Sequence, residues 1–578
     1  MGKIETIRHS LAHILAYAVQ DLWPATKFGI GPAIENGFYY DFQFPNPIAP
    51  EDLPKIEKKM RELIRQDIKF EKKTISKTEG EKLFVDQPYK LELVNEKFKN
   101  QNEKLTTYKS GDFIDLCAGP HIQSTREIPI DGFELTKLAG AYWRGSEKNP
   151  MLTRIYGVAF ATKKDLEDYL KLQEEAEKRD HRILGKKLDL FTFSELVGSG
   201  LPLYTPKGAL VRQLLNNYVE ELQSNIGCTQ VWTPQMAKAD LFKTSGHYDK
   251  YKDSMFRVVS NFSEEEFFLK PMNCPQHTQI YASQMRSYRD LPLRYSDFAM
   301  LYRDEKPGEL NGLARVRSFS QDDLHIFCRE DQVDKEIDVA LKMTKKIMKT
   351  FGFKYRYRLS TRDPQHFEKY IGDPKTWDKV EKWAEKIMMR NKIEYFPGPG
   401  EAAFYAPKMD LIATDALGRE WQLSTVQIDF VMPERFDLTY VDEKGQKVRP
   451  VMIHRAIIGS AERFIMILLE HYAGAFPLWL SPVQVEILNI TDKHLRYAKS
   501  VLKELMAENI RAELKTDGTV SKRIRQAELQ KIPYILVLGD KEIKTKSVAV
   551  RKRGKGDVGT MKLTKFVKIA KEEIQNKK

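Results

Sequence analysis

The spacing of hydrophobic and polar residues divides the chain into stretches of different character. Within residues 1–160, a helix with apolar periodicity at Ile7–Leu22 precedes strand-like segments at Phe28–Phe42, and a charged helix follows at Pro50–Asp67. This mixture predicts an α+β domain. Residues 161–187 are dense in Glu, Lys and Arg, with leucines on one helical stripe, which predicts a solvated linker helix.

The largest stretch covers residues 188–480. A helical pattern at Gly208–Ile226 runs into a short strand at Thr229–Thr233, which Pro234 stops. Strand-like segments then alternate with loops until a last helix is entered near Gly459. Many strands with few helices predict an antiparallel sheet with helices packed on it.

Residues 481–578 alternate between strand and helix patterns. The predicted strands are Val483–Ile490, Arg511–Leu514, Tyr534–Leu538 and Ser547–Lys552, and the predicted helices are Lys493–Asn509, Val520–Gln530 and Leu563–Asn576. This alternation is typical of βαβ units, so we expect a small α/β domain with parallel strands in its sheet.

Composition and charge narrow the class of protein. The clean apolar runs, such as Phe464–Leu469, are far shorter than the roughly 20 residues needed to span a bilayer, so we expect no membrane association. Four cysteines without close pairing predict a reducing compartment, by default the cytoplasm. Lys541–Lys578 holds 13 basic against 4 acidic residues, a skew that favours a polyanion partner over a simple solubilising tail.

The segment Leu301–Cys328 is the richest in candidate chemistry. Strand-like ends joined by the polar turn PGELNG predict a hairpin. Its arginines, Arg303 and Arg315, suit a polyphosphate because a planar guanidinium makes paired, charge-assisted hydrogen bonds to phosphate oxygens. Phe319 offers a ring that can stack on a base. A charged, solvent-exposed hairpin is the alternative interpretation.

A second candidate anion site lies in HRAIIGSAERF. Gly459 and Ser460 predict the entry of a helix, and Arg463 would lie one turn in. An arginine at that position reinforces the attraction of a helix N-terminus for anions. A buried apolar helix that carries one salt-bridged arginine would give the same pattern.

Cysteine and histidine residues suggest two further sites. Cys274, His325 and His454 have the side chains that zinc prefers, but no local zinc-finger spacing, and each could equally be a buried packing residue. Near the N-terminus, the spacing is tighter. HxxxH and CxxxH patterns are formed by His9, His13, Cys117 and His121. These groups suit a metal, a metal-free hydrolytic pocket, or two unrelated structural pairs.

Taken together, the motifs resemble those of threonyl-tRNA synthetases, which are class II aminoacyl-tRNA synthetases. The similar motifs include GPAIENGFYYDF, CAGPH, SGHYDKY, KPMNCP, RVRSFSQDDLHIF, AAFYAPK, VQIDF and MIHRAIIGSAERF. The resemblance implies an editing domain at 1–160, a linker helix at 161–187, a class II catalytic domain with an antiparallel sheet at 188–480 and an anticodon-binding domain at 481–578. It also implies a homodimer that charges tRNA(Thr) with L-threonine.

The resemblance assigns roles to the two arginine motifs. Arg303 would hold the α-phosphate of ATP and the threonyl carboxylate, and Glu305 would contact the adenine. Phe319 would stack on that base. Arg315 and Arg463 would grip the distal phosphates, with Mg²⁺ accompanying ATP. The catalytic residues implied are Arg303, Arg463 and His247, the last assisting transfer to the tRNA.

The resemblance also assigns the remaining candidates. One Zn²⁺ per subunit would be held by Cys274, His325 and His454, and the threonine pocket would be lined by Gln321, Asp323, Tyr405 and Gln422. Because serine lacks only one methyl group, binding alone discriminates against it poorly, and a second hydrolytic site is expected. That editing site would comprise His9, His13, Lys90, Asp115, Cys117 and His121, without a metal. The anticodon would be read by Glu542 and Arg551.

The chain departs from the family at several points. It would begin at the editing domain, without the small ubiquitin-like module that many bacterial members carry first. Glycine or cysteine is usual in the family where this chain has Gln276, Ser318, Ala406 and Leu423. Another class II synthetase, such as a prolyl or seryl enzyme, and a synthetase-derived RNA-binding protein are the alternatives. The zinc ligands argue against the first, and Arg303 with Arg463 against the second.

Overall fold

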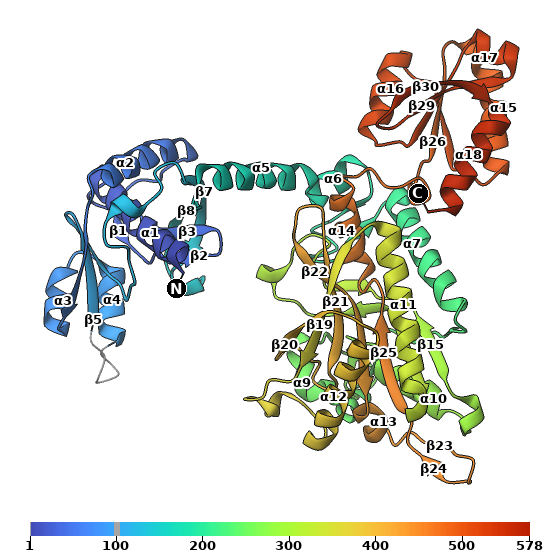
Figure 1. Cartoon of the computed structure of the whole chain (residues 1–578), viewed down its shortest axis with the longest axis horizontal. Helices are drawn as coiled ribbons and strands as arrows, with labels where there is room; N and C mark the ends of the chain where they lie inside the picture. The colour runs from blue at the N-terminus through green and yellow to red at the C-terminus, as the bar shows by residue number, and fades with distance from the viewer. Residues whose placement is uncertain (1, 98–104, 578) are drawn as a thin grey trace. The chain divides into compact units, whose positions relative to one another are not determined.

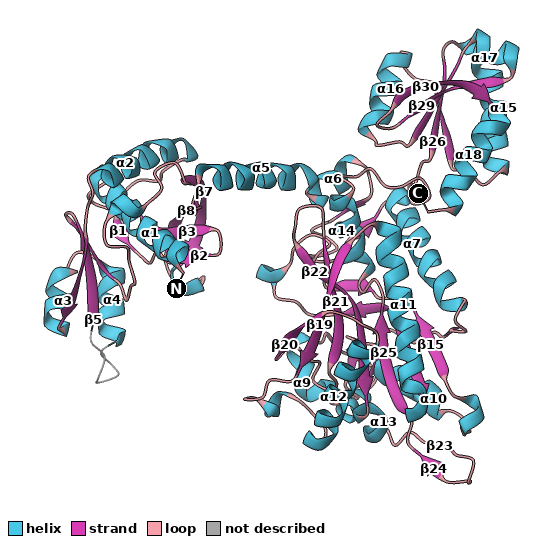
Figure 2. Cartoon of the chain, in the orientation of Figure 1, coloured by secondary structure: helices cyan, strands magenta, loops and turns pink. Residues whose placement is uncertain are grey.

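A computed structural model describes residues 2–97 and 105–577 (Figures 1 and 2). The chain forms two compact units, Met1–Glu174 and Glu175–Lys578, called the N-terminal and C-terminal units below. Among the described residues, no helix combines the length and the apolar character that crossing a membrane requires.

The N-terminal unit is built on a five-stranded antiparallel sheet in the order β1-β3-β8-β7, with β2 paired to β3. Its strands are β1 (Lys27–Phe28), β2 (Ala33–Ile34), β3 (Gly37–Gln43), β7 (Phe133–Tyr142) and β8 (Met151–Ala159). Helix α1 (Lys3–Leu22) lies against this sheet beside α2 (Leu53–Arg65). The apolar face of α1, which includes Leu11 and Leu15, is buried in one core with Phe38. The predicted α+β character is confirmed.

A smaller three-stranded antiparallel sheet, in the order β4-β5-β6, completes the N-terminal unit. Its elements are β4 (Phe70–Ile75), α3 (Lys77–Leu83), α4 (Pro88–Lys97), β5 (Leu105–Ser110) and β6 (Phe113–Leu116). Strand β6 contacts α1. Asp115 and Cys117, at the end of β6, are therefore delivered close to the histidines of α1.

The prediction of a single linker helix over residues 161–187 is wrong. The structure has two helices here, α5 (Lys163–Arg179) and α6 (His181–Lys187). Asp180 has non-helical backbone angles, and its side chain accepts the N–H of Arg182, which starts a new helix. Helix α5 is largely exposed, but α6 buries His181 and Leu184. The charged composition hid this burial because it continues across both helices.

The core of the C-terminal unit is an eight-stranded sheet in the order β11-β15-β18-β25-β22-β21-β19-β20. Its strands are β11 (Thr229–Gln230), β15 (Leu293–Asp297), β18 (Asp323–Cys328), β19 (Lys354–Thr361), β20 (Tyr395–Pro399), β21 (Lys408–Thr414), β22 (Glu420–Asp429) and β25 (Val451–Ala456). Only the two edge pairs are parallel, so the predicted antiparallel sheet is confirmed. Strand β11 ends earlier than the predicted Thr229–Thr233.

Two long helices of this core, α11 (Val333–Phe351) and α12 (Pro374–Arg390), were missed by the sequence prediction of few helices. Both have a clear apolar stripe that enters the core, as with Ile337 and Leu341 of α11. The helix predicted at Gly208–Ile226 and the helix predicted to begin near Gly459 are present as α7 (Pro206–Ser224) and α14 (Ala461–His471).

Shorter elements surround the core. The helices are α8 (Ala239–Ser245), α9 (His247–Tyr251), α10 (Cys274–Ala282) and α13 (Val431–Arg435). The strands are β9 (Phe191–Thr192), β10 (Leu203–Tyr204), β12 (Met236–Lys238), β13 (Arg257–Val258), β14 (Phe267–Leu269), β16 (Met300–Tyr302), β17 (Ser318–Ser320), β23 (Tyr440–Val441) and β24 (Lys447–Val448).

The C-terminal part contains a five-stranded sheet in the order β27-β26-β28-β29-β30. Its strands are β26 (Val485–Asn489), β27 (Ala512–Lys515), β28 (Tyr534–Leu538), β29 (Ser547–Lys552) and β30 (Gly556–Lys562), and its helices are α15 (Leu495–Ala507), α16 (Val520–Leu529), α17 (Asp540–Thr545) and α18 (Leu563–Gln575). Strand β26 is parallel to both neighbours, which confirms the predicted α/β sheet. The sequence prediction missed α17 and β30.

Candidate active sites

The hairpin predicted at Leu301–Cys328 is present over residues 300–320, whereas Asp323–Cys328 forms β18 of the eight-stranded sheet. The tip of the hairpin, residues 306–309, is exposed, but its paired strands carry buried side chains. Strands β16 and β17 pair antiparallel, with Leu301 opposite Phe319. Both side chains are buried, in a small cluster with Val316. The guanidinium carbon of Arg303 lies 5.1 Å from the centre of the Phe319 ring. The hairpin thus brings a cation and an aromatic ring together at one wall of a cavity.

Helix α14 supplies the third arginine of this cavity. The Ser460 hydroxyl accepts the N–H of Arg463 at 3.2 Å and caps the helix, as its sequence predicts. Gly459 precedes it with φ +67°, and a Cβ there would lie 2.9 Å from the carbonyl oxygen of Leu423. A side chain is therefore excluded at this position. Arg463 donates through Nε to the carbonyl oxygen of Ala314 at 3.0 Å.

The electrostatics of this cavity suit a polyanion. It is lined by all five residues assigned to ATP, namely Arg303, Glu305, Arg315, Phe319 and Arg463. Arg315 pairs with Glu305 at 2.7 Å. Burial, and then the nearby Arg303 and Arg315, lower the pKa of Arg463, while Glu305 raises it. The cations are thus held close together at an energetic cost that a polyphosphate would relieve.

Strand register brings the predicted zinc ligands together. His325 of β18 and His454 of β25 are direct partners across the sheet, and Nε2 of His325 lies 3.0 Å from Nδ1 of His454. Cys274 begins α10. The three side chains are buried, with one ligand atom of each within 4.8 Å of the others. Cys274 and His454 lie 51 and 129 positions from His325 along the chain, and the fold brings all three into one cluster.

Two further side chains orient these ligands. Nε2 of His454 lies 2.8 Å from Oδ2 of Asp429, and Nδ1 of His325 lies 2.8 Å from Nδ1 of His277. Each histidine thus has one nitrogen facing the cluster and a partner for the other, as in metal sites with outer-shell support. A thiol and two oriented imidazoles fit zinc. The sequence prediction gave no role to His277 or Asp429, although Asp429 lies in the motif VQIDF and His277 lies two residues after KPMNCP.

A cavity of about 720 Å³ opens beside this cluster. This volume is within the range of small-molecule sites. It is lined by all four residues assigned to threonine, Gln321, Asp323, Tyr405 and Gln422. Asp323 is two residues before His325, so both side chains lie on one face of β18. Burial raises the pKa of Asp323. Arg303 and Gln321 line this cavity and the arginine cavity alike, so the two are neighbours.

His247 lies in a different position from the other predicted catalytic residues. It is fully buried and lies outside the lining of the 720 Å³ cavity. Its Nε2 is 3.2 Å from the sulfur of Met272, which does line the cavity, and 3.8 Å from the sulfur of Cys274. Burial lowers the pKa of His247 to about 3. Its imidazole is therefore neutral near pH 7.

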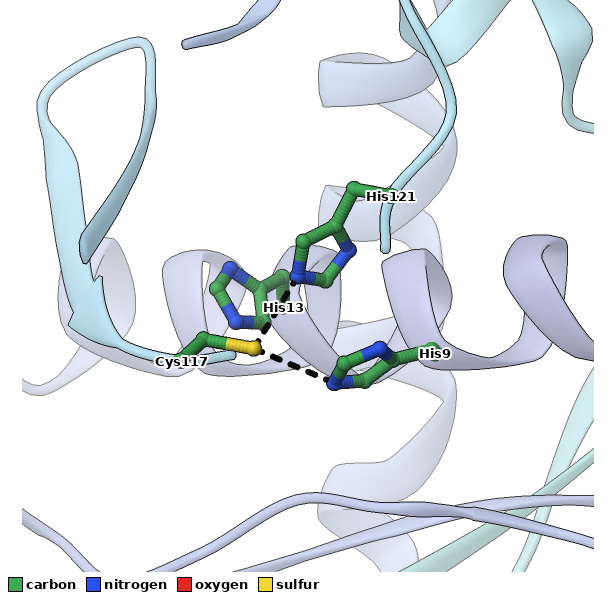
Figure 3. A group of neighbouring side chains, drawn as sticks. All are labelled: His9, His13, Cys117 and His121. Atoms are coloured by element: carbon green, nitrogen blue, oxygen red, sulfur yellow. Dashed lines mark hydrogen bonds between the residues drawn. The ribbon is translucent and has the colours of Figure 1, made fainter. Parts of the chain in front are cut away.

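In the N-terminal unit, the HxxxH and CxxxH pairs form one site (Figure 3). The sulfur of Cys117 lies 3.3 Å from Nε2 of His9 and 3.3 Å from Nε2 of His121. The ring centres of His13 and His121 are 4.2 Å apart. The alternative of two unrelated structural pairs is therefore wrong.

A buried ion pair supports this site. Lys90 binds Asp115, and the Tyr40 hydroxyl donates to Asp115 at 2.6 Å. Nε2 of His13 lies 3.5 Å from the same carboxylate. The Oγ atom of Ser10 lies 3.0 Å from Nδ1 of His121. Tyr40 and Ser10 were not predicted. Ser10 lies one helical turn before His13, a spacing that could have signalled it, whereas Tyr40 comes from a distant strand.

Burial controls the protonation of the N-terminal site. It lowers the pKa of His9, His13 and His121 and raises the pKa of the Cys117 thiol to about 11. All four groups are therefore neutral near pH 7. Neutral imidazoles can accept a proton from water, and a neutral thiol can donate a hydrogen bond. The arrangement suits hydrolysis by proton transfer.

The buried histidines should make the protein less stable in acid. Because their pKa is below the ordinary 6.5 in the folded state, the unfolded chain binds protons more readily as the pH falls. Stability present above about pH 6.5 is then lost towards the lower folded-state pKa. We expect calorimetry to show an unfolding temperature that drops between about pH 7 and 5, and drops less in His13→Gln. An equal drop in His13→Gln and in the exposed control His366→Gln would contradict this expectation.

The two predicted anticodon residues differ in their surroundings. Glu542, in the first turn of α17, accepts the N–H of Gly539 at 3.0 Å and thus caps its own helix. Arg551, on β29, is partly exposed. Its Nη2 atom lies 3.8 Å from Oε1 of Glu528. The carboxylate of Glu542 is therefore already engaged by the backbone, whereas Arg551 is closer to solvent.

The departures from the family pattern are accommodated locally. Gln276 is buried and donates through Nε2 to the carbonyl oxygen of Pro234 at 2.9 Å. Ala406 is buried in the same core cluster as Tyr405. Leu423 packs in the main core, and Ser318 pairs with Tyr302 in the hairpin. None of these residues displaces a predicted ligand.

Comparison with known proteins agrees with this geometry. Residues 256–472 match the tRNA synthetase class II core domain (G, H, P, S and T), 484–573 match an anticodon binding domain, and 105–156 match the threonyl and alanyl tRNA synthetase second additional domain.

Similar proteins cover almost the whole chain. The threonine--tRNA ligase of Rubrobacter xylanophilus is 48% identical over 98% of this chain and 88% of its own length, and that of Gloeobacter violaceus is 49% identical over 99% and 92%. A solved structure titled as the RNA binding domain of threonyl-tRNA synthetase from Cryptosporidium parvum is 38% identical, with a TM-score of 0.65, and covers 68% of this chain and 98% of that one. With its class II core, anticodon-binding domain and editing domain, the chain belongs to the threonyl-tRNA synthetase family of class II aminoacyl-tRNA synthetases.

Proposed function

We propose that this protein is a threonine--tRNA ligase. In the first step, a carboxylate oxygen of L-threonine bonds to the α-phosphorus of ATP, and diphosphate leaves. In the second step, a ribose hydroxyl of tRNA(Thr) replaces AMP. The observation that carries the proposal is the sharing of Arg303 and Gln321 between an arginine-lined cavity and one beside a buried Cys/His cluster. Two substrates held in these cavities would meet at Arg303.

The arginines would bind and orient ATP. Arg303, at the junction of the cavities, is suited to the α-phosphate and the threonyl carboxylate, where negative charge concentrates during displacement. Arg315 and Arg463 would hold the distal phosphates of ATP, which brings Mg²⁺ as its counter-ion. Phe319 would stack on the adenine and Glu305 would accept from its amino group. These roles are mainly positioning and charge stabilisation.

We further propose one zinc ion in each subunit. Cys274, His325 and His454 would hold it, because their donor types, burial and outer partners fit this metal. Zinc would supply a Lewis acid that binds the amino and hydroxyl groups of threonine and so discriminates against valine. Asp323 would accept a hydrogen bond from the threonine hydroxyl, and Gln321, Tyr405 and Gln422 would enclose the amino acid. His247 would assist transfer to the ribose hydroxyl.

The N-terminal unit would hydrolyse seryl-tRNA(Thr). Serine also carries a hydroxyl, and one missing methyl group is worth only about 1–3 kcal/mol of discrimination, so a second site is needed. In that site, a neutral His9 or His121 would take a proton from the attacking water, and the ribose oxygen would leave with a proton. Lys90, Asp115, His13 and Cys117 would hold the ester and the water in place.

The remaining features concern assembly and location. We infer the domain division 1–160, 161–187, 188–480 and 481–578, with anticodon reading by Glu542 and Arg551. A homodimer is supported by exposed apolar side chains on either side of Pro234: Trp232 is 86% exposed and Met236 is 50% exposed. The cytoplasm stays a prediction, which the four free thiols suit.

Exchange of diphosphate into ATP tests the proposed function. We expect exchange that depends on threonine, weaker exchange with serine and almost none with valine. Arg303→Ala should reduce kcat/KM for threonine-dependent exchange by about 100- to 1,000-fold, the usual effect of removing one donor to a developing charge. The matched control is Arg329→Ala, which removes a partly exposed arginine that pairs with Asp331 and lines neither cavity, and which should leave exchange unchanged. Absence of threonine-dependent exchange in the unmodified protein would refute the assignment.

A further inference from the structure

We propose that His181, the buried first residue of α6, is a positioning residue for ATP. It anchors the turn Asn311–Arg315, which carries Arg315 and contacts Arg463, the two arginines assigned to the distal phosphates. The proposal rests on the proposed function and extends it to a residue outside both cavities. His181 does not line either of them. It would therefore act on ATP only through the turn.

The hydrogen bonds of His181 fix its tautomer. Its Nε2 accepts the backbone N–H of Leu313 at 3.1 Å, and its Nδ1 lies 2.6 Å from Oε1 of Glu470. A backbone N–H can only donate and a carboxylate accepts, so the proton is on Nδ1 and the lone pair on Nε2. Glu470 also accepts the backbone N–H of His181 at 3.0 Å. The ring is thus held from one side and holds the turn on the other.

The anchored turn links the two arginines. Asn311 and Arg315 bond each other's backbones, at 3.1 and 3.3 Å, and close the turn. Leu313 at its centre is buried in the main core. The next residue, Ala314, offers its carbonyl oxygen to Arg463 at 3.0 Å. Holding the amide of Leu313 in place therefore holds the backbone of Arg315 and the carbonyl oxygen of Ala314, to which Arg463 donates.

The close approach of ring and turn depends on Gly312. This residue has φ +48°, and a Cβ built on it would lie only 2.0 Å from Nε2 of His181. No side chain other than hydrogen fits there without moving the ring or the turn. The glycine and the histidine are thus matched to each other.

Glu470 is itself held firmly, so the anchor has a fixed base. It lies near the end of α14, the helix whose first turn carries Arg463. Arg419 pairs with Glu470 and also with Asp415 at 2.7 Å. Arg179, at the end of α5, donates to the carbonyl oxygen of His471 at 3.1 Å. His181 therefore ties the turn to the same helix that positions Arg463.

A metal site is the other chemistry that this cluster suggests. Asp180, His181 and Glu470 each offer a ligand atom within 4.8 Å of the others. However, Arg419 already neutralises Glu470, and Arg182 donates to Asp180 through Nε at 3.0 Å. With both carboxylates paired and Nε2 of His181 used by Leu313, the cluster has no ligand set left for a cation.

Two amide variants separate the two bonds of His181. In His181→Gln, the longer side chain can bring its oxygen to the place of Nε2 and accept from Leu313. In His181→Asn, the shorter amide can donate to Glu470 from the place of Nδ1 but leaves the Leu313 N–H without an acceptor. We expect His181→Asn to raise KM for ATP about tenfold in threonine-dependent exchange, the typical effect of one lost hydrogen bond. His181→Gln should stay within about twofold of the unmodified protein.

Kinetics with both substrates distinguish positioning of the turn from a role of His181 in packing alone. KM for threonine should change little in either variant, and Gly312→Ala, which pushes the turn from the ring, should repeat the ATP-specific rise. Equal KM values for ATP in the Asn and Gln variants, or a rise in KM for threonine of the same size, would show a packing role and overturn the proposal. Thermal unfolding of each variant checks that it is folded. Failure of the proposed function is distinguishable, because the unmodified protein would then show no exchange.

Discussion

Replacing Cys274 with alanine is expected to remove bound zinc from the protein and to abolish threonine-dependent exchange. The thiol is one of the three proposed zinc ligands, all of which are buried. Among the described residues, no other cysteine belongs to this cluster. Loss of an outer-shell partner alone typically costs about 10- to 100-fold in metal affinity, so loss of a ligand should cost more. Metal analysis and exchange kinetics on the same preparation measure both effects.

The chain offers two matched controls for this variant. Cys328 is an equally buried cysteine outside the cluster, at the end of the strand that carries His325. Cys328→Ala creates a similar small cavity and should keep zinc and exchange. His277→Ala removes the partner of Nδ1 of His325 and should weaken zinc by about 10- to 100-fold without abolishing it. Zinc and threonine activation that survive in Cys274→Ala would show that the cluster is not a metal site.

Replacing His121 with alanine is expected to leave threonine charging intact and to let seryl-tRNA(Thr) accumulate. His121 contacts Cys117 and Ser10 in the N-terminal unit and has no part in the cavities of the C-terminal unit. A general acid or base typically contributes about 100- to 10,000-fold to a rate, so hydrolysis of seryl-tRNA should fall by at least about 100-fold. The measurement uses pre-charged seryl-tRNA, so it does not depend on activation.

The reciprocal variant completes this test. Arg303→Ala should activate threonine about 100- to 1,000-fold less efficiently but hydrolyse pre-charged seryl-tRNA at the unmodified rate. His366→Ala, which removes an exposed histidine of the C-terminal unit, should change neither reaction. Unchanged hydrolysis in His121→Ala would refute the assignment of the editing site, whereas a joint loss of both activities would indicate unfolding and would be seen in the thermal transition.

The local patterns predicted much of the fold because their periodicity reports burial directly. The stripe on α1 and the alternation of strands and helices after residue 481 appear in the structure with ends shifted by few residues. The prediction failed where composition concealed burial. Uniform charge across residues 161–187 hid the break at Asp180, and the stripes of α11 and α12 were overlooked among many short strands.

The sequence by itself determined the kinds of chemistry this protein carries, because residue types and short spacings such as HxxxH, CxxxH and the capped entry to α14 depend only on neighbours along the chain. Only the tertiary structure decided which groups act together. Register between β18 and β25 made His325 and His454 one cluster, and the pairing of β16 with β17 set Phe319 beside Arg303. His181 reaches Leu313 across 132 positions. Such contacts are made by packing of distant segments, which no local pattern records.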